Sequence, residues 1–585
     1  MTVLRVWAPR ATRVRARTVI DGHRPVTHEL SVDKGSWWSG EVGEIPFGTD
    51  YGFLLDDDEA VRPDPRSRWQ PEGVHGLSSL YDPYEYQWHD RYWTGRDLPG
   101  SVIYELHIGT FTPDGTFDAA IDRLDHLVDL GVTHIELLPV NDFDGTWNWG
   151  YDGVAWYAVH DPYGGPDGLK RFVDAAHVRG LAVVLDVVYN HLGPSGNYLP
   201  RYGPYLTTGR GPWGDLVNLD GEGSADVRRY IVDNALMWLD EFHVDALRLD
   251  AVHALQDGSD PHILAELAAD VDALCAHQGK PLILIAESDL NDPMMIEGRS
   301  AGGRGMDAQW DDDMHHQLHA LLTGERQGYY ADFGTLPGLA KTLERAFFHD
   351  GTYSAFRKRR HGAPVDRVNT PGYRFVVCLQ NHDQIGNRAT GDRITTLTSA
   401  GLVRVGALLL LTSPFTPMLF MGEEWGATTP WQFFTSHPEP ELGRATAEGR
   451  RAEFADHDWG DAVPDPQDPA TFERSRLRWA DLGEDGPRET LRLYRKLIGL
   501  RHTRPELTDP RLDRVHVDYD ETARWVRVHR GALRVVVNLA DEVRTVPVDA
   551  PVVDVLLATE RGFSFGPDGI TLPPESGAVI QVVTS

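Results

Sequence analysis

The amino-acid sequence predicts an α/β fold in which a (β/α)8 barrel lies between an N-terminal and a C-terminal β-sandwich domain. Three observations support this prediction. Short alternating apolar runs with glycine turns extend to about residue 90, which is typical of a sandwich. Strand and helix patterns then alternate strictly over about 400 residues, which favours a parallel barrel. From about Val515 the chain returns to short alternating strands.

The changes of pattern set the expected domain boundaries. We expect the N-terminal sandwich over residues 1–92, the catalytic barrel over residues 93–510 and the C-terminal sandwich over residues 511–585. Residues 190–222 are rich in Gly and Pro and are longer than an ordinary barrel connection. We therefore expect a lid or a small inserted subdomain there.

Eight segments of the central part have the apolar character of barrel strands. Residues 181–188 are almost continuously apolar, which is typical of a strand buried on both faces, whereas residues 308–310 give the weakest signal. In chain order the expected strands are residues 103–108, 134–140, 181–188, 246–249, 282–286, 308–310, 375–379 and 418–421.

Helices are expected between these strands. Apolar residues recur at helical spacing over residues 117–130 and stop at Gly131. Residues 167–180 have a helical pattern, and Ser224 is the expected cap of a helix that extends to Phe242. This order is that of a repeated β/α unit.

Composition excludes several classes of function. The 585 residues hold 88 acidic and 56 basic side chains, a net charge of −32, which argues against nucleic acid and anionic membranes as partners because both need clustered Lys and Arg. No apolar run has the length of a membrane span or a signal peptide. Two cysteines, Cys275 and Cys378, cannot form a disulfide framework. We expect a cytoplasmic protein.

Polar and charged side chains gather where four predicted strands end. In a (β/α)8 barrel the active site lies at this rim, and charges within apolar strands are costly to bury. A single such end is explained by a structural ion pair, but four on one rim indicate a catalytic site. The ends carry Asp186, Asn190 and His191, then Arg248, Asp250 and His253, then Glu287, and then His382, Asp383 and Gln384.

Three of the carboxylates, Asp250, Glu287 and Asp383, stand out, because glycoside hydrolysis uses one carboxylate as nucleophile and one as acid/base. Arg248 lies two residues before Asp250, so both face the same side of the strand, and the cation would keep Asp250 ionised. Glu287 has no equally close cation in the sequence and is the expected proton donor. The third carboxylate, Asp383, is expected to stabilise positive charge on the sugar ring.

Four motifs resemble the four short sequence regions of the α-amylase family, glycoside hydrolase family 13. They occur in the order and spacing of that family. The motifs are DVVYNH at residues 186–191, ALRLDAVH at 246–253, LIAES at 284–288 and QNHDQIGN at 380–387.

This resemblance implies a retaining hydrolase in which Asp250 is the nucleophile, Glu287 the acid/base and Asp383 the transition-state stabiliser. The residues that it implies around the distorted sugar are Asp186, His191, Arg248 and His382. The other motif residues expected to contact substrate are His253, Gln384 and Asn387.

Further segments resemble one subgroup of the family. Among them are PDPRSRWQPEGVHG at residues 63–76, NHLGPSGNYL at residues 190–199 and QFFTSHPEPEL at residues 432–442. The resemblance implies hydrolysis of the α-1,4 bond next to the terminal trehalose of maltooligosyltrehalose, with release of trehalose during trehalose biosynthesis. It also implies related α-1,4-glucans as ligands and a maltooligosyltrehalose synthase as the pathway partner.

Other residues near the rim are candidate sugar contacts. The candidates for stacking on sugar rings are Tyr151, Trp213, Trp425, Trp431, Trp147 and Trp149. Stacking uses the apolar ring faces, and barrel packing is the alternative for each ring. Asp312, His315 and His316 follow the sixth strand and are expected at the trehalose end, with a solvated helix start as an equally open alternative.

We expect no metal and no cofactor. Asn190 occupies the position of a calcium ligand in many α-amylases, but its neighbours in the sequence offer no set of oxygen ligands. His315 and His316 are adjacent rather than four residues apart, so one helix face cannot present both to zinc. No phosphate-binding loop or dinucleotide motif accompanies the barrel.

The same carboxylates leave other functions open. A 1,4-α-glucan branching enzyme shares the N-terminal domain and the chemistry, and a glycogen debranching enzyme is a third candidate. A glucan-binding protein on an inactive barrel is opposed by the intact trio of carboxylates. The products distinguish them, because free trehalose supports the hydrolase and new α-1,6 branches support the branching enzyme.

Overall fold

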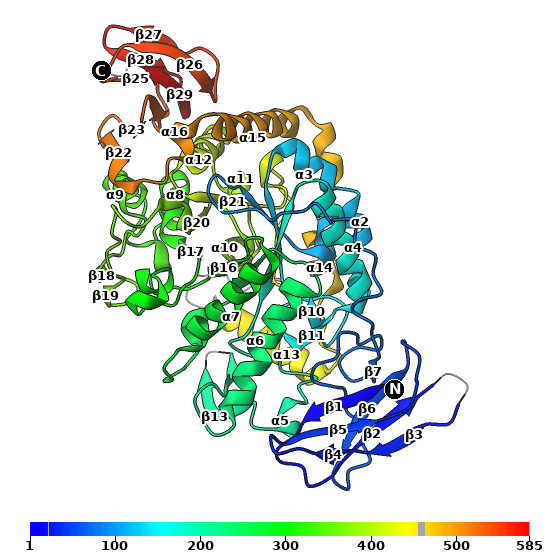
Figure 1. Cartoon of the computed structure of the whole chain (residues 1–585). Coiled ribbons are helices and arrows are strands. Elements are labelled where there is room, and N and C mark those ends of the chain that lie inside the picture. Colours follow the sequence, from blue (N-terminus) through cyan, green and yellow to red (C-terminus); the bar gives the residue numbers. More distant parts are fainter. Residues whose placement is uncertain (21–22, 212, 454–462, 584–585) are drawn as a thin grey trace.

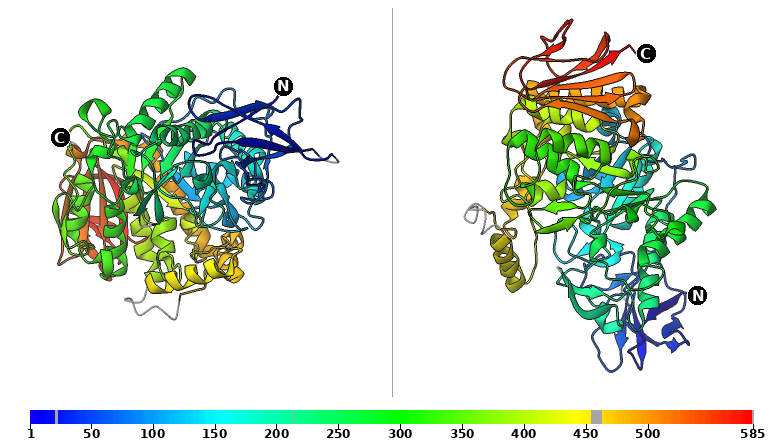
Figure 2. Two further views of the ribbon diagram at one scale, coloured as in Figure 1. Left: turned by 90° about the horizontal axis from the view of Figure 1, so that it is seen from below. Right: turned by 90° about the vertical axis from the view of Figure 1, so that its left-hand side faces the viewer.

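The computed structural model describes residues 1–20, 23–211, 213–453 and 463–583. It confirms the predicted fold class, because a closed parallel barrel is flanked by antiparallel sheets at both ends of the chain. Figure 1 shows the N-terminal and the C-terminal strands at opposite ends of the molecule, with the barrel between them. The views in Figure 2 show the same arrangement.

The N-terminal part consists of two antiparallel sheets that share a buried core. The sheets have the orders β1-β5-β4 and β3-β2-β6-β7. Their strands are β1 (Val3–Trp7), β2 (Val14–Val19), β3 (Val26–Glu29), β4 (Ser31–Val32), β5 (Trp37–Glu41), β6 (Asp50–Leu55) and β7 (Ser78–Ser79). Trp37 attaches these sheets to the barrel, because its Nε1 donates to Asp226 Oδ1 of helix α6 at 3.2 Å.

Eight parallel strands close the barrel, and all eight predicted strands are confirmed, including the weak one at residues 308–310. The strands are β8 (Ile103–Leu106), β9 (His134–Leu137), β12 (Ala182–Val187), β15 (Ala246–Leu249), β16 (Ile283–Ala286), β17 (Ala308–Trp310), β20 (Phe375–Cys378) and β21 (Thr416–Phe420). They follow one another around the barrel in chain order, and β21 pairs with β8 to close it. Their C-terminal ends therefore share one rim.

Helices surround the barrel (Figure 1). The longer helices are α4 (Gly165–Val178), α6 (Ser224–Asp240), α7 (Ile263–Gln278), α8 (Asp312–Thr323), α9 (Leu336–Arg345), α12 (Ala400–Thr412), α13 (Pro440–Glu453) and α15 (Asp485–Thr503). The shorter ones are α1 (Ile108–Phe111), α2 (Phe117–Ile121), α3 (Leu124–Leu130), α10 (His382–Gly386), α11 (Ile394–Leu397), α14 (Pro469–Ser475) and α16 (Pro505–Thr508). Within the described ranges, none is both long and apolar enough to cross a bilayer.

Two predicted helix features are wrong. The helix expected over residues 117–130 is divided into α2 and α3, because the Arg123 N–H bonds to Ala120 O at 3.0 Å and tightens the turn between them. Ser224 does not cap α6 but is its first residue, and Gly223 precedes it in a left-handed conformation with φ 76°. Local hydrogen bonds, rather than apolar spacing, determine where helices end.

Residues 190–222 connect the rim of the barrel to the N-terminal sheets. This segment contains α5 (Leu199–Tyr202), β13 (Leu206–Gly211) and β14 (Gly214–Val217). Tyr202 Oη donates to Pro63 O at 2.8 Å, and the rings of Tyr205 and Trp7 lie 5.2 Å apart. Two further hairpins occur in other barrel connections and are formed by β10 (Asn141–Phe143) with β11 (Gly153–Val159) and by β18 (Thr352–Ser354) with β19 (Arg359–His361).

The C-terminal part also has two antiparallel sheets, with the orders β22-β23-β24-β29-β26 and β25-β28-β27. Their strands are β22 (His516–Asp520), β23 (Trp525–Arg530), β24 (Leu533–Asn538), β25 (Arg544–Val546), β26 (Val552–Ala558), β27 (Ser564–Gly566), β28 (Gly569–Leu572) and β29 (Ser576–Val582). Gly577 of β29 faces Leu408 of α12, and a Cβ at this position would lie 2.5 Å from Leu408 Cδ2. A larger residue at this position would therefore displace the Leu408 side chain.

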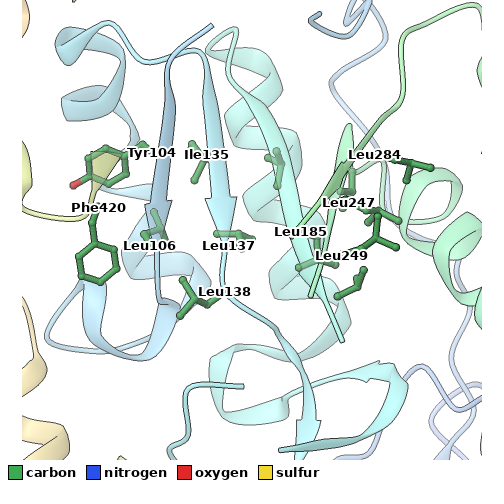
Figure 3. Close-up of a cluster of buried hydrophobic side chains, with 14 of the residues drawn as sticks. Tyr104, Leu106, Ile135, Leu137, Leu138, Leu185, Leu247, Leu249, Leu284 and Phe420 are labelled. Carbon is green, nitrogen blue, oxygen red and sulfur yellow. The ribbon is translucent and has the colours of Figure 1, made fainter. Parts of the chain in front are cut away.

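Alternate residues of each barrel strand face two environments. One set, which includes Leu106, belongs to the apolar core drawn in Figure 3, and this core continues into the surrounding helices. The other set faces the barrel interior and begins with apolar residues such as Ile103 and Val184. Two positions further along the same strands the interior residues are acidic, namely Glu105 and Asp186. The barrel interior thus becomes polar toward the rim.

Glu136 of β9 lies in this polar layer, beside Glu105 in the pairing of β8 with β9. It is 1% exposed, and neither of its carboxyl oxygens has a hydrogen-bond partner in the described part of the chain. Burial, followed by the negative charge of Glu105, raises the pKa of Glu136 well above its usual range. The positive charge of Arg248 opposes this shift, and the net effect is that Glu136 holds its proton more strongly than an exposed glutamate.

Replacing Glu136 by Gln should change how stability depends on pH. The unfolded chain releases the Glu136 proton as the pH rises above 4.5, while the folded protein keeps it. The unfolded state then binds fewer protons, so this group lowers the free energy of unfolding by up to about 1.4 kcal/mol per pH unit. We expect Glu136→Gln to gain stability relative to the wild type as the pH rises above about 5, as measured by urea denaturation. An identical pH dependence of the two proteins would contradict a raised pKa of Glu136.

Candidate active site

One guanidinium connects the carboxylates at the rim. Arg248, near the end of β15, is 2% exposed. Its Nη1 donates to Asp186 Oδ2 at 2.7 Å and to Asp250 Oδ1 at 2.8 Å, and its Nη2 lies 3.6 Å from Glu287 Oε2. Strands β12, β15 and β16 are neighbours in the barrel, so the topology brings these residues together. The predicted nucleophile and the predicted acid/base thus share one cation.

The carboxylate of Asp250 is held at both oxygens. Arg248 binds Oδ1, and Asn190 Nδ2 donates to Oδ2 at 2.8 Å. The indole ring of Trp310, at the end of β17, packs on the guanidinium with its centroid 4.2 Å from Arg248 Cζ, which is a cation–π contact. Asp250 remains partly exposed, so its carboxylate is fixed in orientation and still accessible from the rim.

Glu287 is bound by the backbone that follows Asp250. Ala251 has the left-handed conformation (φ 42°, ψ 49°), which residues with a side chain rarely adopt, and its N–H donates to Glu287 Oε2 at 2.6 Å. Burial raises the pKa of Glu287 to about 8, an effect that Arg248 opposes and the neighbouring carboxylates increase. A carboxyl group that keeps its proton at neutral pH is suited to donate it.

Asp383 lies in the short helix α10, which follows β20. Asn381 caps this helix, since its side chain accepts a hydrogen bond from Gln384 N at 2.7 Å. Asn387 Nδ2 donates to Asp383 Oδ1 at 2.7 Å. Asp383 is one of the charges that raise the pKa of Glu287, so the structure brings all three predicted carboxylates into one site.

The residues expected around the distorted sugar form a hydrogen-bonded chain. Tyr151 Oη donates to Asp186 Oδ2 at 2.6 Å and lies 2.8 Å from His382 Nε2. His191 Nε2 bonds to the backbone oxygen of Tyr151 at 2.9 Å. Burial raises the pKa of Asp186 to about 6, and Arg248 opposes this shift. These predicted residues therefore lie together beside Asp250.

Only some of the predicted aromatic platforms are accessible. Trp213, between β13 and β14, is 49% exposed, and its ring stacks on His191 at 5.5 Å and meets the edge of His253 at 6.5 Å. The prediction is wrong for Trp425 and Trp431, which are 1% and 0% exposed. Their rings belong to the buried core, where a sugar cannot reach them.

The start of α8 faces the site rather than solvent. Gln384 Nε2 donates to Asp312 Oδ1 at 3.4 Å. Burial raises the pKa of Asp312 to about 7, and the charge of Asp383 is the next cause. Asp312 is partly exposed and its hydrogen bond from Gln384 places it beside α10, so its contact with substrate stays a prediction.

The two histidines of α8 have different surroundings. The ring of His316 lies 5.0 Å from that of Tyr329, and Gln384 hydrogen-bonds to His316. His315 is buried and stacks on His319 at 5.4 Å. Direct contact of either histidine with substrate stays a prediction.

Several groups at the site were not predicted from the sequence. They are the carboxylate of Glu105, the amide of Asn190 as a donor to the nucleophile, the backbone N–H of Ala251 and the ring of Trp310. The signal used for the strand ends, a charged residue within an apolar strand, is also present at Glu105 and could have identified it. The Ala251 N–H has no signal in the sequence, because it depends on one unusual backbone conformation.

The fold and the site define a glycoside hydrolase with an alpha-amylase catalytic domain. A family model described as alpha amylase, catalytic domain, matches residues 86–202, and a model described as a domain of unknown function (DUF3459) matches residues 510–579. A solved structure described as a putative alpha amylase from Salmonella typhimurium is 37% identical with a TM-score of 0.90, and the match covers 99% of this chain and 97% of that chain.

Two similar proteins define the family more narrowly. The malto-oligosyltrehalose trehalohydrolase of a Rhizobium species is 55% identical over 582 residues, which cover 98% of this chain and 97% of that protein. The malto-oligosyltrehalose trehalohydrolase of Mycobacterium tuberculosis is 53% identical over 557 residues, which cover 94% of this chain and 95% of that protein. The chain belongs to the malto-oligosyltrehalose trehalohydrolases.

The residues at the calcium position of many α-amylases do not fit a calcium ion here. Asn190 Oδ1 accepts from His191 Nδ1 at 2.5 Å, and Asn190 Nδ2 donates to Asp250 O at 2.9 Å as well as to Oδ2. Both ends of this amide are used within the protein. Among the described residues, His75, Asp144 and Glu439 form one group whose ligand atoms lie within 4.8 Å of one another. Ser195 Oγ lies 2.6 Å from Asp144 Oδ2 and 2.5 Å from Glu439 Oε1, and its one proton can be donated to one of them at a time.

A chelator should therefore leave thermal stability unchanged. A structural cation bound only by the folded state would raise the melting temperature by mass action, and its removal would lower it. Because the Asn190 amide is engaged by His191 and Asp250, we expect excess EDTA to shift the melting temperature by less than about 1 °C. A fall of several degrees that added Ca²⁺ reverses would contradict this expectation.

Proposed function

We propose that the protein hydrolyses the α-1,4 bond next to the terminal trehalose unit of maltooligosyltrehalose and releases trehalose. The observation that carries the chemistry is the arrangement of Asp250 and Glu287 on one guanidinium, that of Arg248, with Asp383 beside them. The choice of bond is supported by the relatives, which are named malto-oligosyltrehalose trehalohydrolases and match over nearly the whole chain.

In the first step Glu287 gives its proton to the glycosidic oxygen as trehalose leaves. Asp250 attacks the anomeric carbon, the bond to the leaving oxygen breaks, and the glucan becomes a β-linked ester on Asp250. Arg248 and Asn190 hold the two oxygens of Asp250 before substrate arrives. The nucleophile therefore needs little reorganisation to reach the anomeric carbon.

In the second step Glu287, now a carboxylate, takes a proton from water. The water oxygen attacks the anomeric carbon, the ester bond breaks, and Asp250 leaves as a carboxylate. Two inversions at one carbon retain the α configuration. Glu287 must first lose and then regain a proton, and its raised pKa of about 8 suits this exchange near neutral pH.

Other residues bind and stabilise the sugars. The carboxylate of Asp383 places negative charge near the oxocarbenium-like ring. Tyr151 and Trp213 offer aromatic faces to the glucan chain. Asp312 and His316, on the first turns of α8, offer polar atoms to the trehalose end.

The surrounding pathway is part of the proposal. A maltooligosyltrehalose synthase would supply the substrate, and the reaction would take place in the cytoplasm as a step of trehalose biosynthesis. Both cysteines, Cys275 and Cys378, are free thiols, as is typical of a reducing compartment. The substrate is neutral, so the net charge of −32 contributes to solubility rather than to steering.

Incubation with maltooligosyltrehalose should release free trehalose, and the loss of either central carboxylate should abolish this release. We expect Asp250→Asn and Glu287→Gln to lower kcat by about three orders of magnitude or more, because each removes a group that takes part in bond making. Chromatography of the products checks both expectations. New α-1,6 branches would instead identify a branching enzyme, cleavage of α-1,6 bonds a debranching enzyme, and near-normal turnover in either variant would refute the roles.

The rate should fall as the pH rises through the pKa of Glu287. The free enzyme must carry the Glu287 proton to start the reaction, and its folded-state pKa is raised to about 8. One pH unit above this value about a tenth of the enzyme is protonated, so kcat/KM at about pH 9 should be roughly tenfold below its value at about pH 7. A pH profile of kcat/KM measures this limb, and a fall that begins near pH 5 would contradict the role of Glu287.

A further inference from the structure

Glu105 is a buried carboxylate that the mechanism above does not use. It lies on β8, faces the barrel interior and is 1% exposed. Both of its oxygens bind one residue, since Oε2 accepts from the His382 backbone N–H at 2.8 Å and Oε1 accepts from His382 Nδ1 at 2.5 Å. The two residues are 277 positions apart in the chain. Glu105 thus fixes both the backbone and the ring of one residue of the site.

We propose that Glu105 is a positioning residue that holds the His382 ring as a doubly protonated donor facing Tyr151 and the reacting sugar. The proposal rests on the proposed function and on the place beside the distorted sugar that the family resemblance implies for His382. Glu105 itself is separated from the sugar by His382, and it acts through the ring that it holds.

The hydrogen bonds of the His382 ring show which of its nitrogens carry protons. Tyr151 has one hydroxyl proton, and it donates this proton to Asp186 Oδ2 at 2.6 Å. The Tyr151 oxygen is then an acceptor for His382 Nε2 at 2.8 Å, so Nε2 carries a proton. Nδ1 carries a proton as well, because the Glu105 carboxylate only accepts. The His382 ring is therefore an imidazolium.

The charges around the ring favour this state. Burial lowers the pKa of His382, but the negative charge of Glu105 and its hydrogen bond outweigh burial, and the net pKa is raised. The titratable and charged groups that face the ring are Glu105 of β8, His107 after β8, Tyr151 before β11, Asp186 of β12, Arg248 of β15 and Asp383 of α10. The positive charge of Arg248 lowers the pKa of His382 and disfavours the charged ring, whereas the negative charges of the carboxylates favour it.

Glu136 provides a matched control within the same barrel layer. It is the direct neighbour of Glu105 in the strand pairing and is equally buried. Among the described residues no group hydrogen-bonds to its carboxyl oxygens. A change from Glu to Gln therefore has the same size and depth at both positions, but only the change at Glu105 removes a charge that contacts His382.

Glu105→Gln should lower kcat by about 10- to 100-fold at about pH 7, with a change in KM of less than about threefold, because the misplaced ring matters most for the distorted sugar. Without the charge at Glu105 the pKa of His382 falls. The activity of Glu105→Gln relative to wild type should therefore rise as the pH is lowered from about 8 to about 5.5. Glu105→Asp keeps the charge and should keep the wild-type pH profile, and Glu136→Gln should leave kcat and the profile unchanged.

Two outcomes of these kinetic measurements would overturn the proposal. A wild-type kcat and pH profile in Glu105→Gln would show that the charge does not control the ring. An equal loss in Glu136→Gln would show a general effect of changes in the barrel interior. Thermal melting of each variant identifies a loss that comes from unfolding.

A measurement without substrate separates this proposal from the proposed function. In enzyme labelled with ¹⁵N-histidine, the signals missing from His382→Asn identify the His382 ring. We expect both ring nitrogens to be protonated at about pH 7.5 in the wild type and a neutral ring in Glu105→Gln. A neutral ring in the wild type would overturn the proposal even if trehalose is released. Failure to release trehalose would instead refute the proposed function and leave the result on ring protonation intact.

Discussion

The buried guanidinium of Arg248 is the contact on which the site depends. It carries positive charge within hydrogen-bonding distance of Asp186 and Asp250 and 3.6 Å from Glu287. Burial without a hydrogen-bond donor raises the pKa of a carboxyl group, as it does at Glu136, where no described residue donates to the carboxyl and Arg248 only partly opposes the shift. Arg248 allows several acids to lie close together at the rim without all becoming neutral. The Trp310 ring that packs on it keeps the guanidinium plane in place.

The two central carboxylates have different environments, and this difference assigns their roles. Asp250 receives one charged donor and one amide donor, from Arg248 and Asn190, which is the setting of an ionised nucleophile. Glu287 receives one backbone donor and a more distant guanidinium, and burial keeps its proton to a higher pH. The left-handed conformation of Ala251 supplies that backbone donor. The strained backbone of Ala251 therefore places a hydrogen-bond donor from the end of β15 against Glu287, which follows the neighbouring strand β16.

Periodicity and strand order made most of the fold predictable, because a parallel barrel requires apolar strands in strict alternation with helices. The carboxylates were predictable because charged residues that end apolar strands have few structural explanations. The burial of Trp425 and Trp431 was not predictable, since residue type does not distinguish an indole at the surface from one in the core. The contact between Glu105 and His382 was not predictable either, because it joins the first and seventh barrel strands and exists only once the barrel is closed.

The pairing of Glu105 with Glu136 shows how the barrel interior limits its own charge. The two acids are neighbours in one layer, and two ionised carboxylates at that depth would repel each other strongly. Glu105 accepts two hydrogen bonds from His382, whereas Glu136 accepts none from the described residues, so negative charge is stabilised at Glu105 and the pKa of Glu136 is raised. The barrel interior thus keeps a negative charge at Glu105, where that charge orients His382. Within the polar layer beneath the rim, Glu105 is therefore connected to the active site through His382, whereas Glu136 has no such contact among the described residues.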